Sequence, residues 1–316
     1  MRIAIVYGGW SSEAMASAKN AKSIEAVLRD KGYDVCMLEF GRDMVQTLRR
    51  EKADIVYLCV QGKHHGDGTL QAMLEHEGIP FTGSGARAAA LINDKILCKL
   101  LFDRCGIPTP RWAILSKEQY ERGDFDYSAF GYPFVAKAPT QGGSFGIELI
   151  RSPEDLEKIG PVFGYDDPIL LEEFIDGGFY TVGLFERAGR LVTLKCVEGV
   201  ETLSGTRVEK KNDLTLFTGE YGTEPPRLDP ACLREIERTA ERVFKITGAR
   251  GVGRVDFMAD RDTGAFYVLE INAVPGLKRG SLMPREAAYS GVVYEDMVED
   301  ILLSAWNGVE REEDDV

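Results

Sequence analysis

The chain has 316 residues, of which 44% are hydrophobic and 28% charged, and it carries a formal net charge of −13 at pH 7. That length is enough for about two or three lobes, each with a core of its own. The negative charge argues against a nucleic-acid partner, and no apolar run approaches the ~20 residues that a membrane-spanning helix needs, so we expect no membrane segment either.

The first residues, MRIAIVYGG, enter a strand directly, and no signal-peptide pattern precedes them, so we expect a cytoplasmic protein. The six cysteines form no Cys-x-x-Cys pair and lie mostly within apolar or helical patterns. We expect them to be reduced and buried.

Residues 1–84 alternate between strands and helices. We predict strands over 2–7, 34–39 and 55–60, and helices over 15–31, 43–51 and 68–77. Such alternation indicates a small parallel sheet with flanking helices. Gly8-Gly9 after the first strand raises the hypothesis of a dinucleotide site, and hence of a nicotinamide dehydrogenase, but GGWSSE lacks the G-x-G-x-x-G spacing.

Gly83-Ser84-Gly85 breaks this alternation, and we place a lobe boundary near residue 85. Beyond it we predict helices over 86–92, 94–105 and 116–122, and strands over 111–115, 134–138, 146–150 and 169–174. Lys137 lies in an otherwise apolar strand, FVAKA, where its burial would be costly unless the ammonium group reached an anion. The Gln-Gly-Gly-Ser run that follows supplies backbone N–H groups, so this segment is predicted to cover phosphates. The alternative is a lysine on an exposed strand face.

The last third of the chain is predicted to contain strands over 181–186 and 191–197 and helices over 230–247, 284–288 and 294–306. Residues 198–220 are rich in Gly, Thr, Lys and Glu and have no clear period, which is typical of a functional flap or of a disordered segment. Glu209-Lys210-Lys211 would let such a flap fold over an anionic ligand.

Polar residues recur at strand spacing in GVGRVDFMADRDTGAFYVLEINAVPG, residues 251–276. Arg254 and Asp256 are two apart, as are Glu270 and Asn272, so each pair shares one face of a strand while the intervening apolar residues face a core. The run DRDTG has turn chemistry. A reversal near Thr263 would set Asp256 opposite Glu270 and Arg254 opposite Asn272.

Two carboxylates directly opposite each other repel unless something neutralises them. A hard cation bound by Asp256, Glu270, the amide oxygen of Asn272 and phosphate oxygens would do so. We therefore predict a Mg²⁺ and nucleotide-phosphate site on this hairpin. The alternative is an ordinary hairpin whose acidic face is solvated.

Several longer motifs extend over nearly the whole chain: GGWSSE, QGKHHGDGTLQAMLE, PFTGSGARAAALINDK, the Lys137 strand with its Gly-Ser loop, GVGRVDFM, VLEINAVPGL and GSLMP. Together they resemble the ATP-grasp superfamily, and within it the D-alanine:D-alanine ligases. The resemblance implies an α/β and α+β fold of three lobes. The first lobe, residues 1–84, would be Rossmann-like (pre-ATP-grasp) and lie on the first-substrate side. The central lobe, residues 85–174, would cover the phosphates. The C-terminal lobe, residues 175–316, would contain the metal and oxyanion site and the flap 198–220.

The resemblance also implies which residues bind the nucleotide and its metal. The metal ligands would be Asp256, Glu270 and Asn272, in agreement with their spacing. The ATP-binding residues would be Lys95, Lys137 and Lys211 at the phosphates, Ser144 in the Gly-Ser loop, Glu172 at the adenine amino group, and Phe174 and Leu269 beside the ring.

The catalytic and substrate-binding positions follow from the same resemblance. Arg254 and the N–H of Gly276 would form an oxyanion hole, and Glu13 would face the ammonium group of the first amino acid. Ser281 and the N–H of Leu282, near a helix start, would receive the carboxylate of the attacking amino acid.

The implied reaction is an ATP-dependent ligation of a carboxylate to an amine. The γ-phosphoryl group of ATP passes to the carboxylate, the amine attacks the acyl phosphate, and phosphate leaves. The expected cofactors are ATP and Mg²⁺, with Mn²⁺ as the alternative ion. The expected partners are small amino-acid-like substrates, and a homodimer is an open alternative to a monomer.

Several positions depart from the ligase pattern. Gln61 and Gly66 replace a histidine and a glutamate of the second motif, Gly143 and Asn212 replace a serine and a tyrosine, and Phe179 replaces a ribose-binding glutamate. Because most of these changes fall around the first substrate, we expect a different first substrate, with Gln61 and His64 contacting it. A plain D-alanine:D-alanine ligase and a non-catalytic nucleotide-binding protein are the alternatives.

Overall fold

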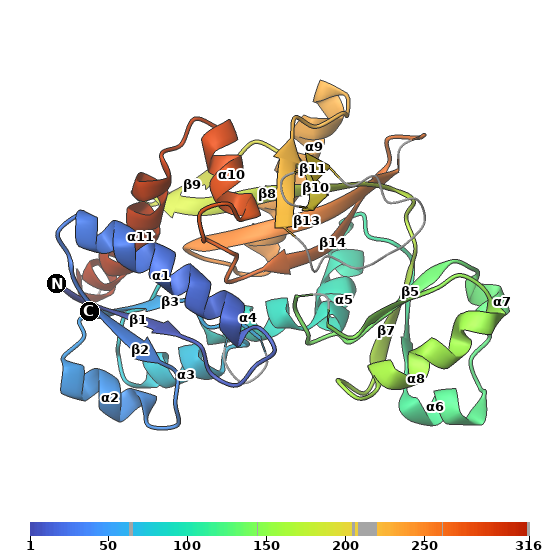
Figure 1. The fold of residues 1–316 in the computed structure, drawn as a ribbon, viewed down its shortest axis with the longest axis horizontal. Helices are drawn as coiled ribbons and strands as arrows, with labels where there is room; N and C mark the ends of the chain where they lie inside the picture. Colours follow the sequence, from blue (N-terminus) through green and yellow to red (C-terminus); the bar gives the residue numbers. More distant parts are fainter. Residues whose placement is uncertain (63–65, 144, 204–205, 208–219, 261, 315–316) are drawn as a thin grey trace.

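The computed structural model describes residues 1–62, 66–143, 145–203, 206–207, 220–260 and 262–314. Three separate β-sheets follow one another along the long axis of the molecule (Figure 1). Most predicted elements lie within two residues of the expected bounds. No helix in the described part of the chain is long and apolar enough to cross a membrane.

The N-terminal sheet is parallel, with strand order β2-β1-β3, as the alternation of elements predicts. Alternate residues of β1 point into two different cores, so the strand is buried on both faces and reads as a continuous apolar run. The elements are β1 (Arg2–Tyr7), α1 (Ala14–Asp30), β2 (Asp34–Glu39), α2 (Met44–Glu51), β3 (Ile55–Leu58) and α3 (Thr69–His76).

The C-terminal helix α11 (Tyr294–Asp314) packs on this first sheet (Figure 1). Its Met297 and Ile301 share a core with Ile3 and Ile5 of β1. At the edge of that contact, Glu299 accepts hydrogen bonds of 2.7 Å from both Lys31 Nζ and Tyr33 Oη. The two ends of the sequence are therefore held together by one core.

The largest sheet has seven strands in the order β11-β10-β8-β13-β14, with β12 added on β10 and β9 on β8. One apolar face of the sheet packs on α9, α4 and α5. The elements are α4 (Ala86–Asn93), α5 (Lys95–Cys105), β8 (Gly177–Arg187), β9 (Arg190–Thr193), β10 (Val197–Leu203), β11 (Thr206–Arg207), β12 (Glu220–Glu224), α9 (Pro230–Ile246), β13 (Val252–Asp260), β14 (Phe266–Asn272) and α10 (Leu282–Tyr289).

One prediction in this sheet is wrong. The expected strand 191–197 is interrupted, because the N–H groups of Lys195 and Cys196 donate to side chains, Ser290 Oγ at 2.8 Å and Glu237 Oε1 at 3.0 Å, instead of to a neighbouring strand. The flap predicted over 198–220 stays a prediction, and within it β10 and β12 pair as an antiparallel ladder. Residues 204–205 and 208–219, which include Glu209, Lys210, Lys211 and Asn212, lie outside the described residues.

The four-stranded sheet is antiparallel, with order β4-β7-β5-β6. Phe134 and Ala136 of β5 and Leu171 of β7 face its helical layer, so Lys137 and Glu172 project from the opposite face. The elements are β4 (Trp112–Leu115), α6 (Lys117–Arg122), α7 (Tyr127–Phe130), β5 (Phe134–Lys137), β6 (Ile147–Ile150), the 3₁₀ helix η1 (Pro153–Lys158), α8 (Ile159–Val162) and β7 (Ile169–Glu173). The predicted lobe boundaries stay a prediction. The helices α4 and α5, which were expected in the central lobe, share a core with the seven-stranded sheet.

A backbone contact between two turns places the start of β13. The N–H of Arg250 donates to Ser84 Oγ at 3.1 Å, and a Cβ atom built on Gly251 would lie 2.8 Å from the backbone nitrogen of Gly83. Gly251 also has a positive φ of 70°. This position therefore requires glycine both for its conformation and for the close approach.

We predict that Gly251→Ala lowers the free energy of unfolding by roughly 1–3 kcal/mol more than Gly291→Ala does. Gly291 is the matched control, because its φ of 75° is similar but a Cβ there would meet no atom within 4 Å. Urea unfolding of both variants measures the difference. Equal losses would show that the contact with Gly83 contributes nothing.

Candidate active site

The hairpin of β13 and β14 has the predicted register at its functional end. Asp256 pairs with Glu270, and Arg254 pairs with Asn272. Toward the turn the register shifts, because Phe257 pairs with Val268 and leaves Leu269 as the extra residue of a bulge. The bulge was not predicted. A uniform reversal near Thr263 gives the correct partners for Arg254 and Asp256, but not for Phe257 and the residues nearer the turn.

Asp256 is 3% exposed, and its carboxylate is surrounded by donors. Arg254 binds it through Nε and Nη2 at 2.8 and 2.7 Å, and Asn272 Nδ2 donates at 2.9 Å. Thr181 Oγ1, from the neighbouring strand β8, donates at 2.9 Å. Burial lowers the pKa of Arg254, but Asp256, Glu286 and Glu270 together raise it by more, so the guanidinium stays charged.

Glu270 is neutralised by a cation from a different element. Lys95, the first residue of α5, places Nζ 3.2 Å from Glu270 Oε2 and donates to the carbonyl of Gln141 at 2.8 Å. Burial raises the pKa of Glu270, but Lys95 and Lys137 lower it by more. The protein's own cations therefore offset part of the repulsion between the two carboxylates, and the predicted metal ion stays a prediction.

The donor set still suits a hard cation. Asp256, Glu270 and Asn272 offer carboxylate and amide oxygens on adjacent strand positions, which are the ligands that Mg²⁺ prefers. No group of three or more His, Cys, Asp or Glu side chains is gathered for metal binding among the described residues. Three protein side chains are too few for the roughly six ligands of Mg²⁺, so further oxygens would come from phosphates and water.

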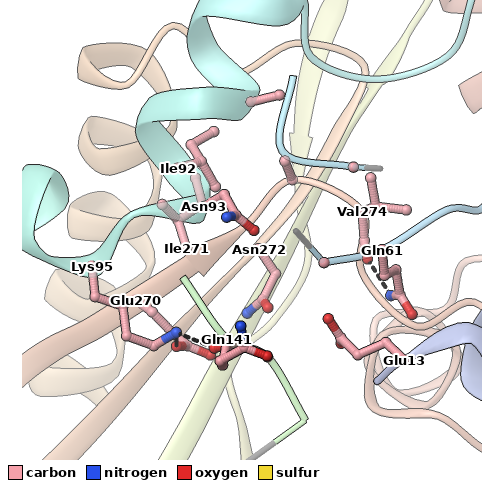
Figure 2. A pocket seen from close by; sticks show the side chains of 15 residues that line it. Glu13, Gln61, Ile92, Asn93, Lys95, Gln141, Glu270, Ile271, Asn272 and Val274 are labelled. Atoms are coloured by element: carbon pink, nitrogen blue, oxygen red, sulfur yellow. Dashed lines mark hydrogen bonds and ion pairs between the residues drawn. The ribbon is translucent and has the colours of Figure 1, made fainter. Parts of the chain in front are cut away.

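A cavity of about 550 Å³, open to solvent, lies beside this hairpin (Figure 2). It lies where the loop after β3, the loop between β5 and β6, and the start of α5 meet β14. Its polar lining includes Glu13, Gln61, Asn93, Lys95, Gln141, Glu270 and Asn272. The sequence-predicted Glu13, Gln61, Lys95, Glu270 and Asn272 are thus brought together.

Glu13 precedes the first turn of α1 and points into this cavity (Figure 2). Its carboxyl group has no hydrogen bond or ion pair with any described residue, and burial raises its pKa although Lys95 acts in the opposite sense. Two glycines lie against it: a Cβ atom on Gly142 would be 2.5 Å from Glu13 Oε2, and one on Gly62 would be 3.1 Å from it. Glu13 is therefore free to bind a cation.

The departures at positions 61 and 66 have structural explanations. Gln61 Nε2 donates to the carbonyl of Val274 at 2.6 Å, which joins the loop after β3 to the loop after β14 (Figure 2). A Cβ atom on Gly66 would lie 2.6 Å from the carbonyl oxygen of Val60, so no side chain fits there. His64 and its neighbours 63 and 65 lie outside the described residues.

Two of the predicted nucleotide-binding residues, Lys137 and Glu172, lie on the face of the four-stranded sheet opposite its helices. Glu172 is 2% exposed and forms ion pairs with both Lys137 and Lys99. Lys99 was missed, although its signal was present: it lies three residues from Ile96 and from Phe102, on the buried face of α5. Phe174 follows β7 directly, and Ser144 lies outside the described residues.

The other end of the site is built by the loop after β14. Ser281 is the N-cap residue of α10, and its own N–H donates to the carbonyl of Lys278 at 2.8 Å. Leu282 is the first residue of the helix, so its N–H belongs to the open helix start. A Cβ atom on Gly276 would lie 3.2 Å from Ser281 Oγ. Asn20, which was not predicted, holds this loop because its Oδ1 accepts from the N–H groups of Leu277 and Lys278 at 3.2 and 2.9 Å.

Residues 101–303 match the family model described as D-ala D-ala ligase C-terminus. The chain is 34% identical over 98% of its length to the whole D-alanine–D-alanine ligase of Carboxydothermus hydrogenoformans. It is 33% identical over 96% of its length to 94% of the ligase of Geobacter sulfurreducens. The chain belongs to the D-alanine–D-alanine ligase family. The crystal structure of the Bacillus anthracis ligase covers 99% of this chain, and 99% of its own, with 26% identity and a TM-score of 0.84.

Membership of the D-alanine–D-alanine ligase family confirms the predicted ATP-grasp fold class and ligase activity. The expectation of a different first substrate is not supported, because the relatives that match over the full length are named for D-alanine. Two of the departures have another reason, because Gln61 and Gly66 are explained by the loop backbone. A departure from the ligase pattern changes the preferred substrate only if a contact with that substrate is lost.

Glu286 of α10 is a further residue of this ligase that was not predicted. Its side chain is fully buried, and Oε2 accepts a hydrogen bond from the N–H of Gly183 in β8. Oε1 has no hydrogen-bond partner among the described residues. Burial raises the pKa of Glu286 to about 7, with Arg254 opposing. The signal was its spacing, since it lies three residues after the buried Met283.

We predict that Glu286→Gln removes a pH-dependent loss of stability. The raised pKa means that the folded protein holds a proton that the unfolded chain loses above about 4.5, so stability falls as pH rises from about 4.5 to 7. Relative to wild type, the variant should gain roughly 2–3 kcal/mol across that window. Urea unfolding at pH 5 and pH 8 measures the gain. Glu235→Gln, on the exposed face of α9, is the control and should show the same difference from wild type at both pH values.

Proposed function

We propose that the protein is an ATP-dependent D-alanine–D-alanine ligase. The observation that carries the proposal is the convergence of Glu13, the Lys95–Glu270 pair and Asn272 on one cavity beside the Arg254–Asp256 pair. An anion and a set of oxygen donors in one cavity suit a substrate ammonium group and a nucleotide metal, respectively. The names of its relatives support D-alanine as the substrate.

The nucleotide would lie between the four-stranded and seven-stranded sheets. Asp256, Glu270 and Asn272 would hold Mg²⁺ or Mn²⁺, which supplies neutralisation of phosphate charge when bound. Lys95 and Lys137 would bind phosphate oxygens, with Ser144 and Lys211 as further candidates. Glu172 would accept from the adenine amino group, with Phe174 and Leu269 beside the ring.

The residues of the hairpin would stabilise the transition state. The reaction transfers the γ-phosphoryl group to the carboxylate of one D-alanine, and the amine of a second D-alanine then attacks the acyl phosphate and releases phosphate. Arg254 uses Nε and Nη2 to bind Asp256, so Nη1 and the N–H of Gly276 would donate to the tetrahedral oxyanion.

Substrate orientation would depend on two ends of the cavity. Glu13 would bind the ammonium group of the first D-alanine, and this new ion pair would lower the raised pKa of its carboxyl group. Ser281 and the N–H of Leu282 at the start of α10 would bind the carboxylate of the second. Gln61 would hold the surrounding loops through Val274, and a role for His64 remains a prediction, as does a homodimer.

A non-catalytic nucleotide-binding protein is the second candidate. The presence of an arginine held bidentately beside the metal-binding positions argues against it, because binding alone has no use for an oxyanion donor. We expect ADP release to depend on D-alanine, Mg²⁺ and the enzyme together, with a dipeptide product visible by mass spectrometry. L-alanine is the control substrate. ATP binding without ADP release on a panel of amino acids would favour the second candidate.

We predict that Glu270→Gln and Asp256→Asn each reduce kcat by about 100-fold or more. Glu270→Gln removes a metal ligand and the partner of Lys95, and Asp256→Asn also releases Arg254. Coupled ADP-release kinetics measures the loss, and circular dichroism checks the fold. Asp262→Asn, in the exposed turn of the same hairpin, is the matched control. Turnover near that of wild type in either active-site variant would refute the assignment.

A further inference from the structure

Lys99 is a fully buried lysine, with 0% of its side chain exposed. Its ammonium group forms an ion pair with Glu172 Oε2 and donates a hydrogen bond to Thr109 Oγ1. Burying an ammonium group costs several kcal/mol unless its partners compensate, so this lysine needs an explanation. The roles proposed above for the reaction leave it unused.

The two partners of Lys99, Thr109 and Glu172, connect it to two different sheets. Thr109 Oγ1 donates to the carbonyl of Val268 at 2.8 Å, and the N–H of Val268 donates to the carbonyl of Pro108 at 2.8 Å. Val268 is in β14 of the seven-stranded sheet, whereas Glu172 is in β7 of the four-stranded sheet. The ammonium group of Lys99 therefore has a fixed place at the junction of the two sheets.

The two lysines that bind Glu172 differ in their freedom to move. Lys137 contacts Oε1, its side chain is 12% exposed, and it stands at the end of β5 before the 139–145 loop. Lys99 contacts Oε2 and is enclosed on all sides. If Lys137 turns toward nucleotide phosphates, Glu172 loses one counter-ion while it remains 2% exposed. Among the residues that the structure describes, only Lys99 then remains to keep the buried carboxylate ionised.

We propose that Lys99 is a positioning residue that holds Glu172 as an ionised, oriented hydrogen-bond acceptor for a 6-aminopurine while Lys137 binds the nucleotide phosphates. The inference rests on the proposed function, in which Glu172 recognises adenine. An ionised carboxylate can only accept hydrogen bonds, whereas a protonated one can also donate. Lys99 would therefore set the preference for a 6-amino over a 6-oxo purine without touching the nucleotide.

Burial and charge act on Glu172 in opposite senses. Burial raises the pKa of this carboxyl group, but Lys137 and Lys99 together lower it by more. Burial also lowers the pKa of Lys99, with Glu172 opposing. Removing Lys99 leaves burial opposed by Lys137 alone, and once Lys137 binds phosphate the acid becomes protonated. A protonated Glu172 would donate to the 6-oxo group of ITP and would bind ATP less well.

The test compares ATP with ITP in steady-state kinetics of Lys99→Met, a variant of similar shape without charge. We expect KM for ATP to rise about tenfold or more, and the ratio of kcat/KM for ATP to that for ITP to fall about tenfold or more. KM for D-alanine should not change. Cys98→Ala, a neighbouring core substitution in α5, is the control and should leave the ATP:ITP ratio as it is in wild type.

A double-mutant cycle separates positioning from mere packing. In a Glu172→Gln background, Lys99→Met should change the ATP:ITP ratio less than twofold, because the carboxylate that Lys99 serves is gone. Thr109→Val removes the second anchor and should shift the ratio in the same direction by a smaller factor. Equilibrium binding of ATP and ITP to Thr109→Val provides the readout should Lys99→Met fail to fold.

The outcomes distinguish the inference from the function on which it rests. If Glu172→Gln changes the ATP:ITP ratio and Lys99→Met leaves it unchanged, the role of Lys99 is refuted while adenine recognition by Glu172 stands. If neither substitution changes the ratio, Glu172 does not read the purine and both assignments fail. An equal effect of Lys99→Met with and without Glu172→Gln would show a structural role only and would also refute the proposal.

Discussion

The site depends on one electrostatic constraint, which is the placement of two carboxylates on directly opposed strand positions. Asp256 and Glu270 would repel each other, and each is neutralised by a different cation: Arg254 from the same strand and Lys95 from the start of α5. The second of these contacts ties the hairpin to a helix, and Lys95 also binds the carbonyl of Gln141 in the loop that follows β5. Charge balance thus joins three separate elements around one cavity.

The proposed ligand-binding groups bind one another in the structure. Lys95 pairs with Glu270, and Lys137 pairs with Glu172, so no charge at these positions is buried alone. Binding of ATP would exchange these ion pairs for contacts with phosphate and purine. The net free energy of binding is therefore smaller than the new contacts alone suggest. Lys99 differs, because its ammonium group is completely buried and is held between Glu172 and Thr109.

Glycines explain why motif departures are poor evidence for a new substrate. The carbonyl of Val60 leaves no room for a Cβ atom at Gly66, and Gly62 and Gly142 lie against the carboxyl group of Glu13. The shape of the cavity around Glu13 is thus set by close backbone approach. A position-by-position comparison of side chains shows that a functional group is missing. It does not show that the backbone nearby leaves no room for that group.

The sequence alone determined the strands, the paired faces of the hairpin and the opposition of Asp256 to Glu270, because these follow from the two-residue period of a strand and the chemistry of a turn. Only the tertiary structure decided which group neutralises each carboxylate, where the ladder slips at Leu269, and that Lys99 and Glu286 are fully buried. Those features depend on contacts between residues that are far apart in the chain. A local sequence pattern does not show which distant residues meet in the fold.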